Sequence, residues 1–207
     1  RKTFGYNPSI YLKRYTALES EDYCDFVRFN PEEVKTNFCY KPSFRVAGFG
    51  IETASSRAST KDIAAYWETY NGENLEQKMY DLLNPPTHGE GGICIATPEN
   101  KTGTYLFGVI VPDYSKTTKE MMTCIIPSAE YVIFTTPPID NTETATSCQE
   151  DPLAEMVKET WRYIFLEWFP KSGYLFDENK LDFEFYDERC HGSTQLVMDI
   201  YIPIKKA

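Results

Sequence analysis

Histidine is scarce in this sequence, and the short motifs of the commonest enzyme classes are missing. Only His88 and His191 occur among 207 residues. The sequence has no Gly-x-Ser-x-Gly motif, no glycine-rich phosphate loop and no Gly-x-Gly-x-x-Gly fingerprint. These absences exclude the usual serine-hydrolase, nucleotide-hydrolysing and dinucleotide-dependent chemistries, and we expect no cofactor.

Long apolar runs are also missing. A helix that crosses a membrane needs about 18 or more consecutive apolar residues, and no stretch of the chain approaches this length. The first ten residues, RKTFGYNPSI, lack both the apolar core of a signal peptide and an initiating methionine. We therefore expect a cytoplasmic protein with no membrane partner, and a chain that is a fragment of a longer one.

Paired cysteine spacings are absent as well. None of the six cysteines stands in the Cys-x-x-Cys arrangement that zinc and thiol-exchange sites use. Reduced thiols in the cytoplasm are the preferred interpretation, and no metal site is expected. Three disulfides in a secreted protein are the alternative.

Positive charge is in short supply, and it is unevenly placed. The net charge of −10 argues against a chain that follows a phosphate backbone along most of its length. Residues 1–17 nevertheless carry four basic side chains and no acid, whereas residues 18–33 carry six acids and only one base, Arg28. The charge of the chain therefore changes from basic to acidic near residue 18.

What the sequence does contain is a duplication of about 80 residues per copy, visible in the order of its predicted elements. Each copy reads as strand, helix, strand, strand. The first copy consists of a strand at 44–53, a helix at 61–83 that Gly72 interrupts, and a hairpin of strands at 93–97 and 104–112. The second consists of an extended segment at 122–138, a helix at 151–169, and strands at 181–188 and 196–204.

The second helix has clear signals at both ends. Asp151 is a good N-cap and Pro152 suits the first helical position. Pro170 and Gly173 are expected to end the helix. Two such copies can join edge to edge with both helices on one side. The predicted fold is α+β, with one curved antiparallel sheet, two long helices on one face, and a cleft between them that suits a small molecule.

Glu167 is the most informative residue of the second helix. It lies one position off the apolar stripe, within the aromatic run WRYIFLEWF and beside Tyr163. The first interpretation is a carboxylate that reaches water or pairs with Lys171. The second is a carboxylate kept dry among rings, where it would attract a cation. The stripe consists of Leu153, Met156, Val157, Thr160, Trp161, Ile164 and Trp168.

Further rings accompany this acid. Tyr201 separates from the aliphatic row of the last strand, because alternation places it on the face of Val197, Asp199 and Pro203. Large rings also stand at equivalent places in the two copies. The predicted ligand-binding residues are Trp67, Tyr105, Tyr131, Phe134, Tyr163, Glu167 and Tyr201.

Four segments resemble a known family. LEWFPKSGY (166–174), DIYIPI (199–204), YLFGVIV (105–111) and the duplicated element order are similar to the GyrI-like effector-binding domain of bacterial AraC-type and MerR-type transcription regulators. The resemblance covers residues 42–205 and implies a domain, at 42–207, that binds hydrophobic, often cationic molecules, including several drugs. It also implies that Glu167 attracts the ligand's charge and that Trp67 and Tyr201 line the same space.

The N-terminal residues extend this resemblance. RKTFGYNPSIYLKR is similar to the end of an AraC-type helix-turn-helix domain, so residues 1–17 are expected to be its remnant and 18–41 a linker. DNA would then be a partner only through a missing upstream domain. Two other functions stay open. One is hydrolysis of electrophilic cyclopropanes with Glu167 and Tyr201 as catalytic pair, and the other is a protein-binding module.

Overall fold

A computed structural model describes residues 28–53, 75–97, 102–140, 152–192 and 194–207. Within these residues the chain forms two compact units. Unit 1 contains residues up to Cys39, residues 130–178 and the C-terminal residues from Arg189, and unit 2 contains residues 40–129 and 179–188. The predicted helix at 61–83 is described only from Leu75 onward, and Trp67 and residues 1–17 lie outside the described part. No helix among the described residues is long and apolar enough to cross a membrane.

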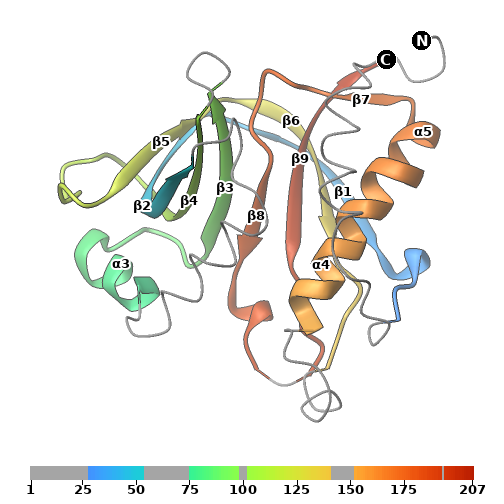
Figure 1. Ribbon diagram of the computed structural model, residues 1–207, viewed down its shortest axis with the longest axis horizontal. Coiled ribbons are helices and arrows are strands. Elements are labelled where there is room, and N and C mark those ends of the chain that lie inside the picture. Colours follow the sequence, from blue (N-terminus) through green and yellow to red (C-terminus); the bar gives the residue numbers. More distant parts are fainter. Residues whose placement is uncertain (1–27, 54–74, 98–101, 141–151, 193) are drawn as a thin grey trace. The chain divides into compact units, whose positions relative to one another are not determined.

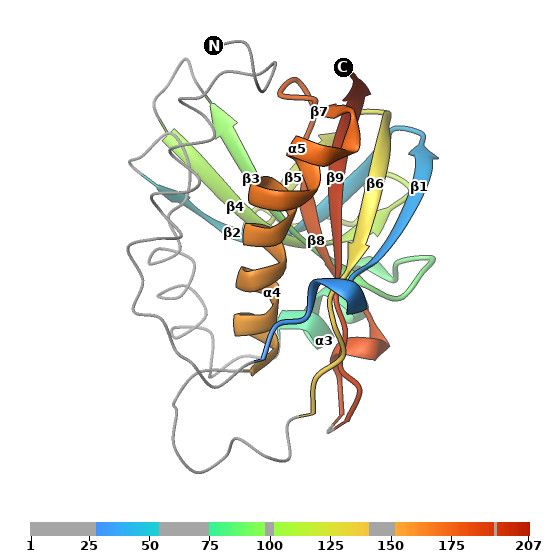
Figure 2. The ribbon, with the colours of Figure 1, turned by 90° about the vertical axis from the view of Figure 1, so that its right-hand side faces the viewer.

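Unit 1 is an antiparallel sheet with one long helix along it (Figure 2). Strand β6 lies between β1 and β9, and the short strand β7 pairs with the end of β9. The strands are β1 (Lys35–Lys41), β6 (Ala129–Thr135), β7 (Tyr174–Phe176) and β9 (Asp199–Lys206). A short 3-10 helix, η1 (Pro31–Glu33), precedes β1.

Strand β1 lies within the segment that was expected to be a linker. Its residues were assigned to the linker at 18–41, yet they form a strand beside β6. The reason is local, because Thr36, Phe38 and Tyr40 alternate with polar residues, and aromatic and β-branched side chains favour strands. The described part of the expected linker is therefore structured from residue 31 onward.

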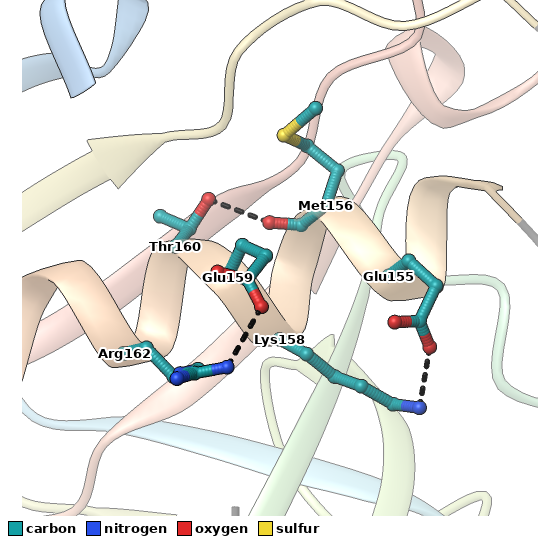
Figure 3. Close-up of polar contacts among 6 residues, drawn as sticks. All are labelled: Glu155, Met156, Lys158, Glu159, Thr160 and Arg162. Carbon is teal, nitrogen blue, oxygen red and sulfur yellow. Dashed lines mark hydrogen bonds and ion pairs between the residues drawn. The ribbon is translucent and has the colours of Figure 1, made fainter. Parts of the chain in front are cut away.

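The long helix of unit 1 is continuous but changes its winding. It consists of α4 (Pro152–Tyr163), a π-helical turn η2 (Ile164–Trp168) and α5 (Phe169–Ser172). Pro152 begins it, as predicted, and the predicted stripe is buried at Leu153, Met156, Val157, Thr160 and Ile164. Two ion pairs lie on the side of α4 opposite this stripe. Lys158 Nζ lies 2.5 Å from Glu155 Oε1, and Arg162 Nη1 lies 3.2 Å from Glu159 Oε1 (Figure 3).

The helix runs past Pro170, where the sequence predicted its end. Proline lacks an N–H and clashes with the fourth carbonyl before it, which normally breaks a helix. The π turn changes the hydrogen-bond register just before this point, since the N–H of Phe169 bonds to the oxygen of Ile164. Pro170 then falls in the first turn of α5, where a missing N–H is tolerated.

Unit 2 consists of antiparallel strands with helix α3 (Leu75–Leu83) against one face (Figure 1). Its strands run in the order β8-β3-β4-β2-β5. Their bounds are β2 (Phe44–Thr53), β3 (Glu90–Thr97), β4 (Thr102–Val111), β5 (Met122–Ile126) and β8 (Phe183–Tyr186). The core between α3 and the sheet contains Ala47, Phe49, Leu75, Met79, Leu83, Tyr105, Phe107, Val109 and Val111.

The predicted duplication is recognisable in this topology. Strand β8, from the second sequence copy, pairs antiparallel with β3 from the first, as expected for copies joined at their edges. Each unit combines an antiparallel sheet with a helix, so the α+β class is confirmed. The segment 122–138, predicted as one extended stretch, is divided into β5 and β6, with Pro127 between them. Strand β7 was not predicted.

Candidate functional site

Glu167 is solvent-exposed in the π turn. Its side chain is 52% exposed, and its Oε2 lies 3.5 Å from Nζ of Lys171. A π turn rotates the chain less per residue than an α-helix, so Ile164 and Phe165 face inward while Leu166 and Glu167 face outward. The structure therefore agrees with the first of the two interpretations, in which this acid pairs with Lys171. Its role in ligand binding stays a prediction.

The motif around Glu167 also shapes the chain at the end of the helix. Ser172 Oγ accepts a hydrogen bond from the N–H of Tyr174 at 3.1 Å and donates to the carbonyl oxygen of Phe169 at 3.1 Å. Gly173 has φ +74°, the left-handed conformation that ends helices. The carbonyl oxygen of Gly173 then accepts from the N–H of Ala207. The Ser-Gly-Tyr part of the motif thus turns the chain from α5 into β7.

Trp168 is the centre of an aromatic cluster in unit 1. Its ring meets Phe134 edge to face, with centroids 5.0 Å apart, and stacks on Tyr174 at 6.2 Å. Phe38 of β1, which is 49% exposed, lies 6.3 Å away. Phe134 is therefore one predicted ligand residue that the structure places beside the Glu-Trp motif.

Two other predicted residues meet on the opposite face of this sheet. The rings of Tyr131 and Tyr201 are T-shaped with centroids 6.0 Å apart, and both are buried. Ile133 pairs with Tyr201 and Phe134 with Ile200, so alternation puts Phe134 on one face and both tyrosines on the other. The predicted set is thus divided within unit 1, and Tyr163 contacts yet another ring, that of Phe29.

In unit 2 the predicted residue Tyr105 belongs to a group of polar rings and an acid. These side chains gather over Gly92, where a Cβ atom would lie 3.1 Å from the Tyr105 hydroxyl and 3.6 Å from Glu184 Oε2. The hydroxyl of Tyr186 donates to Glu184 Oε2 at 2.8 Å. Because Gly92 has no side chain, two phenols and a carboxylate can approach one another above it.

Register places Glu184 and Gly92 in one row with two phenylalanine residues. Phe49 of β2 pairs with Phe107 of β4, Phe107 with Gly92 of β3, and Gly92 with Glu184 of β8. Phe107 also meets Tyr186 edge to face at 6.2 Å. An acid, a position without a side chain and two phenylalanine rings therefore follow one another, and we call Phe49, Phe107, Gly92 and Glu184 the acid–ring row.

A cation already occupies the ring at the other end of this row. Lys78 of α3 places its Nζ 5.0 Å from the centroid of Phe49, within the range of a cation–π interaction. Attraction between an ammonium and an aromatic face is worth about 0.5 to 2 kcal/mol. The chemistry of the acid–ring row is therefore compatible with positive charge.

A second acid, Glu90, is buried at the start of β3. Its Oε1 accepts a hydrogen bond of 2.5 Å from the hydroxyl of Tyr80, whose oxygen in turn accepts from the N–H of Gly89 at 2.8 Å. Burial, followed by the bond to Glu90, raises the pKa of Tyr80, so this phenol stays a donor at neutral pH. A side chain at Gly89 would collide with the ring of Phe185, which explains the glycine there.

Sequence reasoning missed Glu90, Glu184, Tyr80 and Tyr186. Glu90 was assigned to a loop, because the stretch NPPTHGEGG is rich in turn residues. The structure begins β3 at Glu90, three residues before the predicted strand. The period-two pattern could have indicated that Glu90 shares a face with Gly92. The pairing of β3 with β8, which brings Glu184 to this face, is not visible in the sequence.

Comparison with known proteins agrees with this fold. The model of the family described as integron-associated effector binding protein, Cass2, matches residues 38–204. No protein of curated function matches the sequence.

Solved structures are similar in fold at low sequence identity. SAV2435 bound to tetraphenylphosphonium has a TM-score of 0.63 and 14% identity, over 83% of this chain and 94% of that one. A putative transcription regulation protein from Staphylococcus aureus MU50 has a TM-score of 0.57 and 16% identity, over 83% and 98% of the two chains. The C-terminal domain of EcmrR has a TM-score of 0.50 and 12% identity, over 84% and 99%.

Proposed function

Because the chain belongs to the family of integron-associated effector-binding proteins, we propose that it is the ligand-sensing domain of a bacterial transcription regulator and binds a hydrophobic, positively charged small molecule. The family assignment confirms the expected GyrI-like, effector-binding character. An AraC-type DNA-binding domain upstream stays part of the proposal, as does the division into a remnant at 1–17, a linker and a sensor.

The observation that carries the proposal is the acid–ring row of unit 2. Glu184 is half-buried and held by Tyr186, and Tyr105 approaches it across Gly92. A lipophilic cation gains from rings through burial and cation–π contact, and from a partly desolvated carboxylate through charge. A neutral ligand of the same shape would gain only burial, so this arrangement favours cations.

The fold neighbours support the same ligand class. SAV2435 was solved with tetraphenylphosphonium, an aromatic cation. We propose that Tyr105, Tyr186 and Glu184 of unit 2 contact the ligand. The predicted contacts of Tyr131, Phe134, Tyr163 and Tyr201 in unit 1, and of Trp67, remain proposals of the same kind.

The test is isothermal titration calorimetry of the protein with tetraphenylphosphonium. Glu184→Gln removes the charge but keeps the shape, and should weaken binding about fivefold to tenfold, which corresponds to about 1 to 1.4 kcal/mol. Triphenylphosphine oxide, a neutral aromatic analogue, should bind both proteins equally.

The matched control is Glu178→Gln, which removes one negative charge from an exposed position. It should leave the affinity unchanged, because exposed charges are screened. If Glu184→Gln and Glu178→Gln change the affinity for tetraphenylphosphonium by the same factor, the net charge of the protein attracts the cation and the acid–ring row does not.

A further inference from the structure

Three potential metal ligands meet where α3, the following loop and β3 come together. Glu76 stands in the first turn of α3, His88 in the loop, and Glu90 at the first residue of β3. One donor atom from each of these side chains lies within 4.8 Å of the other two. All three belong to unit 2, and none of them is a member of the acid–ring row.

The spacing of these donors is close to what an ion requires. Zinc binds carboxylate oxygens and imidazole nitrogens at about 2.0 to 2.2 Å, so two ligands on one ion are at most about 4.2 Å apart. The observed separation thus requires only a small contraction. His88, whose side chain is 48% exposed, and the half-buried Glu76 have the freedom to supply it.

Neighbouring groups orient two of the three ligands, as in established metal centres. Tyr80 donates to Glu90 Oε1 at 2.5 Å and fixes that buried carboxylate. The Nδ1 of His88 lies 3.3 Å from Glu188 Oε2, and the imidazole stacks on the ring of Tyr80 at 5.2 Å with an interplanar angle of 14°. A carboxylate on one imidazole nitrogen prepares the other for a metal.

We propose that Glu76, His88 and Glu90 bind one divalent transition-metal ion, with Zn²⁺ or Co²⁺ as the matching class. The imidazole distinguishes this group from an ordinary acidic cluster, because nitrogen ligands favour such ions over Mg²⁺ and Ca²⁺. Three protein ligands leave room for water on the ion. The ion would connect the start of α3 to the start of β3 and stabilise this end of unit 2.

The experiment uses the full chain, freed of metal with a chelator and titrated with Zn²⁺ by calorimetry. We expect one ion per chain, at least tenfold weaker binding in His88→Gln and in Glu76→Gln, and no comparable binding of Mg²⁺. Both variants change surface-accessible positions, and circular dichroism verifies their folding. Glu90→Gln is avoided, since it alters a buried group.

Two controls separate this site from other ligands in the chain. His191→Gln changes the other, exposed histidine and should leave Zn²⁺ affinity unchanged. The Co²⁺ complex should lack the thiolate charge-transfer absorption that cysteine ligands produce. Equal Zn²⁺ affinity in wild type and His88→Gln, thiolate absorption, or no saturable binding of Zn²⁺ would each overturn the proposal.

Discussion

Glu167 shows how much the orientation of a single carboxylate depends on the local winding of its helix. The sequence placed it at the edge of the buried stripe by assuming a constant rotation per residue. The π turn at Ile164–Trp168 shifts that phase, and the carboxylate faces solvent next to Lys171. Residue type and spacing left two interpretations of this charge open, and the departure from α-helical geometry decided where it points.

This position yields a prediction for ligand binding. Glu167→Gln should change the affinity for tetraphenylphosphonium less than about twofold, because an exposed, paired charge is screened by water and salt. Calorimetry at physiological ionic strength measures this affinity, and Lys171→Gln, which removes the partner of Glu167, is measured beside it. A several-fold loss in Glu167→Gln would instead restore the role that the family resemblance implies for this acid.

The division of the predicted site has an equally simple origin. Tyr131 and Phe134 are three positions apart on one strand, and an odd separation puts side chains on opposite faces. The sequence therefore contained the information that they cannot line one surface of β6. Glu90 and Glu184 were less accessible to prediction, since pairing between distant strands brings them to the face of Tyr105.

At the scale of elements, the ends of α5 and β7 depend on one backbone conformation. Gly173 has φ +74°, and a Cβ atom there would meet nothing within 4 Å. Gly173→Ala should therefore lower the free energy of unfolding by about 1 kcal/mol through backbone strain alone. Urea denaturation measures the change.

Gly173→Asn provides the graded comparison. Asparagine tolerates the left-handed region better than alanine, so its cost should be smaller. If both variants are as stable as wild type, the turn between α5 and β7 does not require this conformation.

Most elements were predictable because each follows from a local rule. The helix start at Pro152, the alternation of β9 and the hairpin of β3 and β4 all derive from neighbouring residues. The exceptions, β7 and the passage through Pro170, depend on a partner far away in the sequence or on a change of helix type. Periodicity contains neither kind of information.

At the scale of the whole molecule, two partly buried groups in unit 2 make stability depend on alkaline pH. Burial raises the pKa of the Cys124 thiol above its ordinary 9.0, and burial, then the charge of Cys124, raises that of Tyr114. The unfolded chain therefore releases these protons first as the pH rises. Since stability falls wherever the unfolded state binds fewer protons, it should decrease above about pH 9.

Urea denaturation between pH 7 and pH 10 tests this. The free energy of unfolding of the wild type should be constant from pH 7 to 8 and should decrease between pH 9 and 10. The decrease between pH 9 and 10 should be smaller in Cys124→Ala. An identical slope in both proteins would show that other groups control alkaline unfolding.

The π turn has a consequence for comparing relatives. It is the form that a helix takes when it absorbs one extra residue while both of its ends stay fixed. Pairwise alignments across residues 164–168 can therefore match letters correctly and still pair side chains that point in different directions. Transferring a role between homologues within this segment therefore requires that their backbones be superposed first.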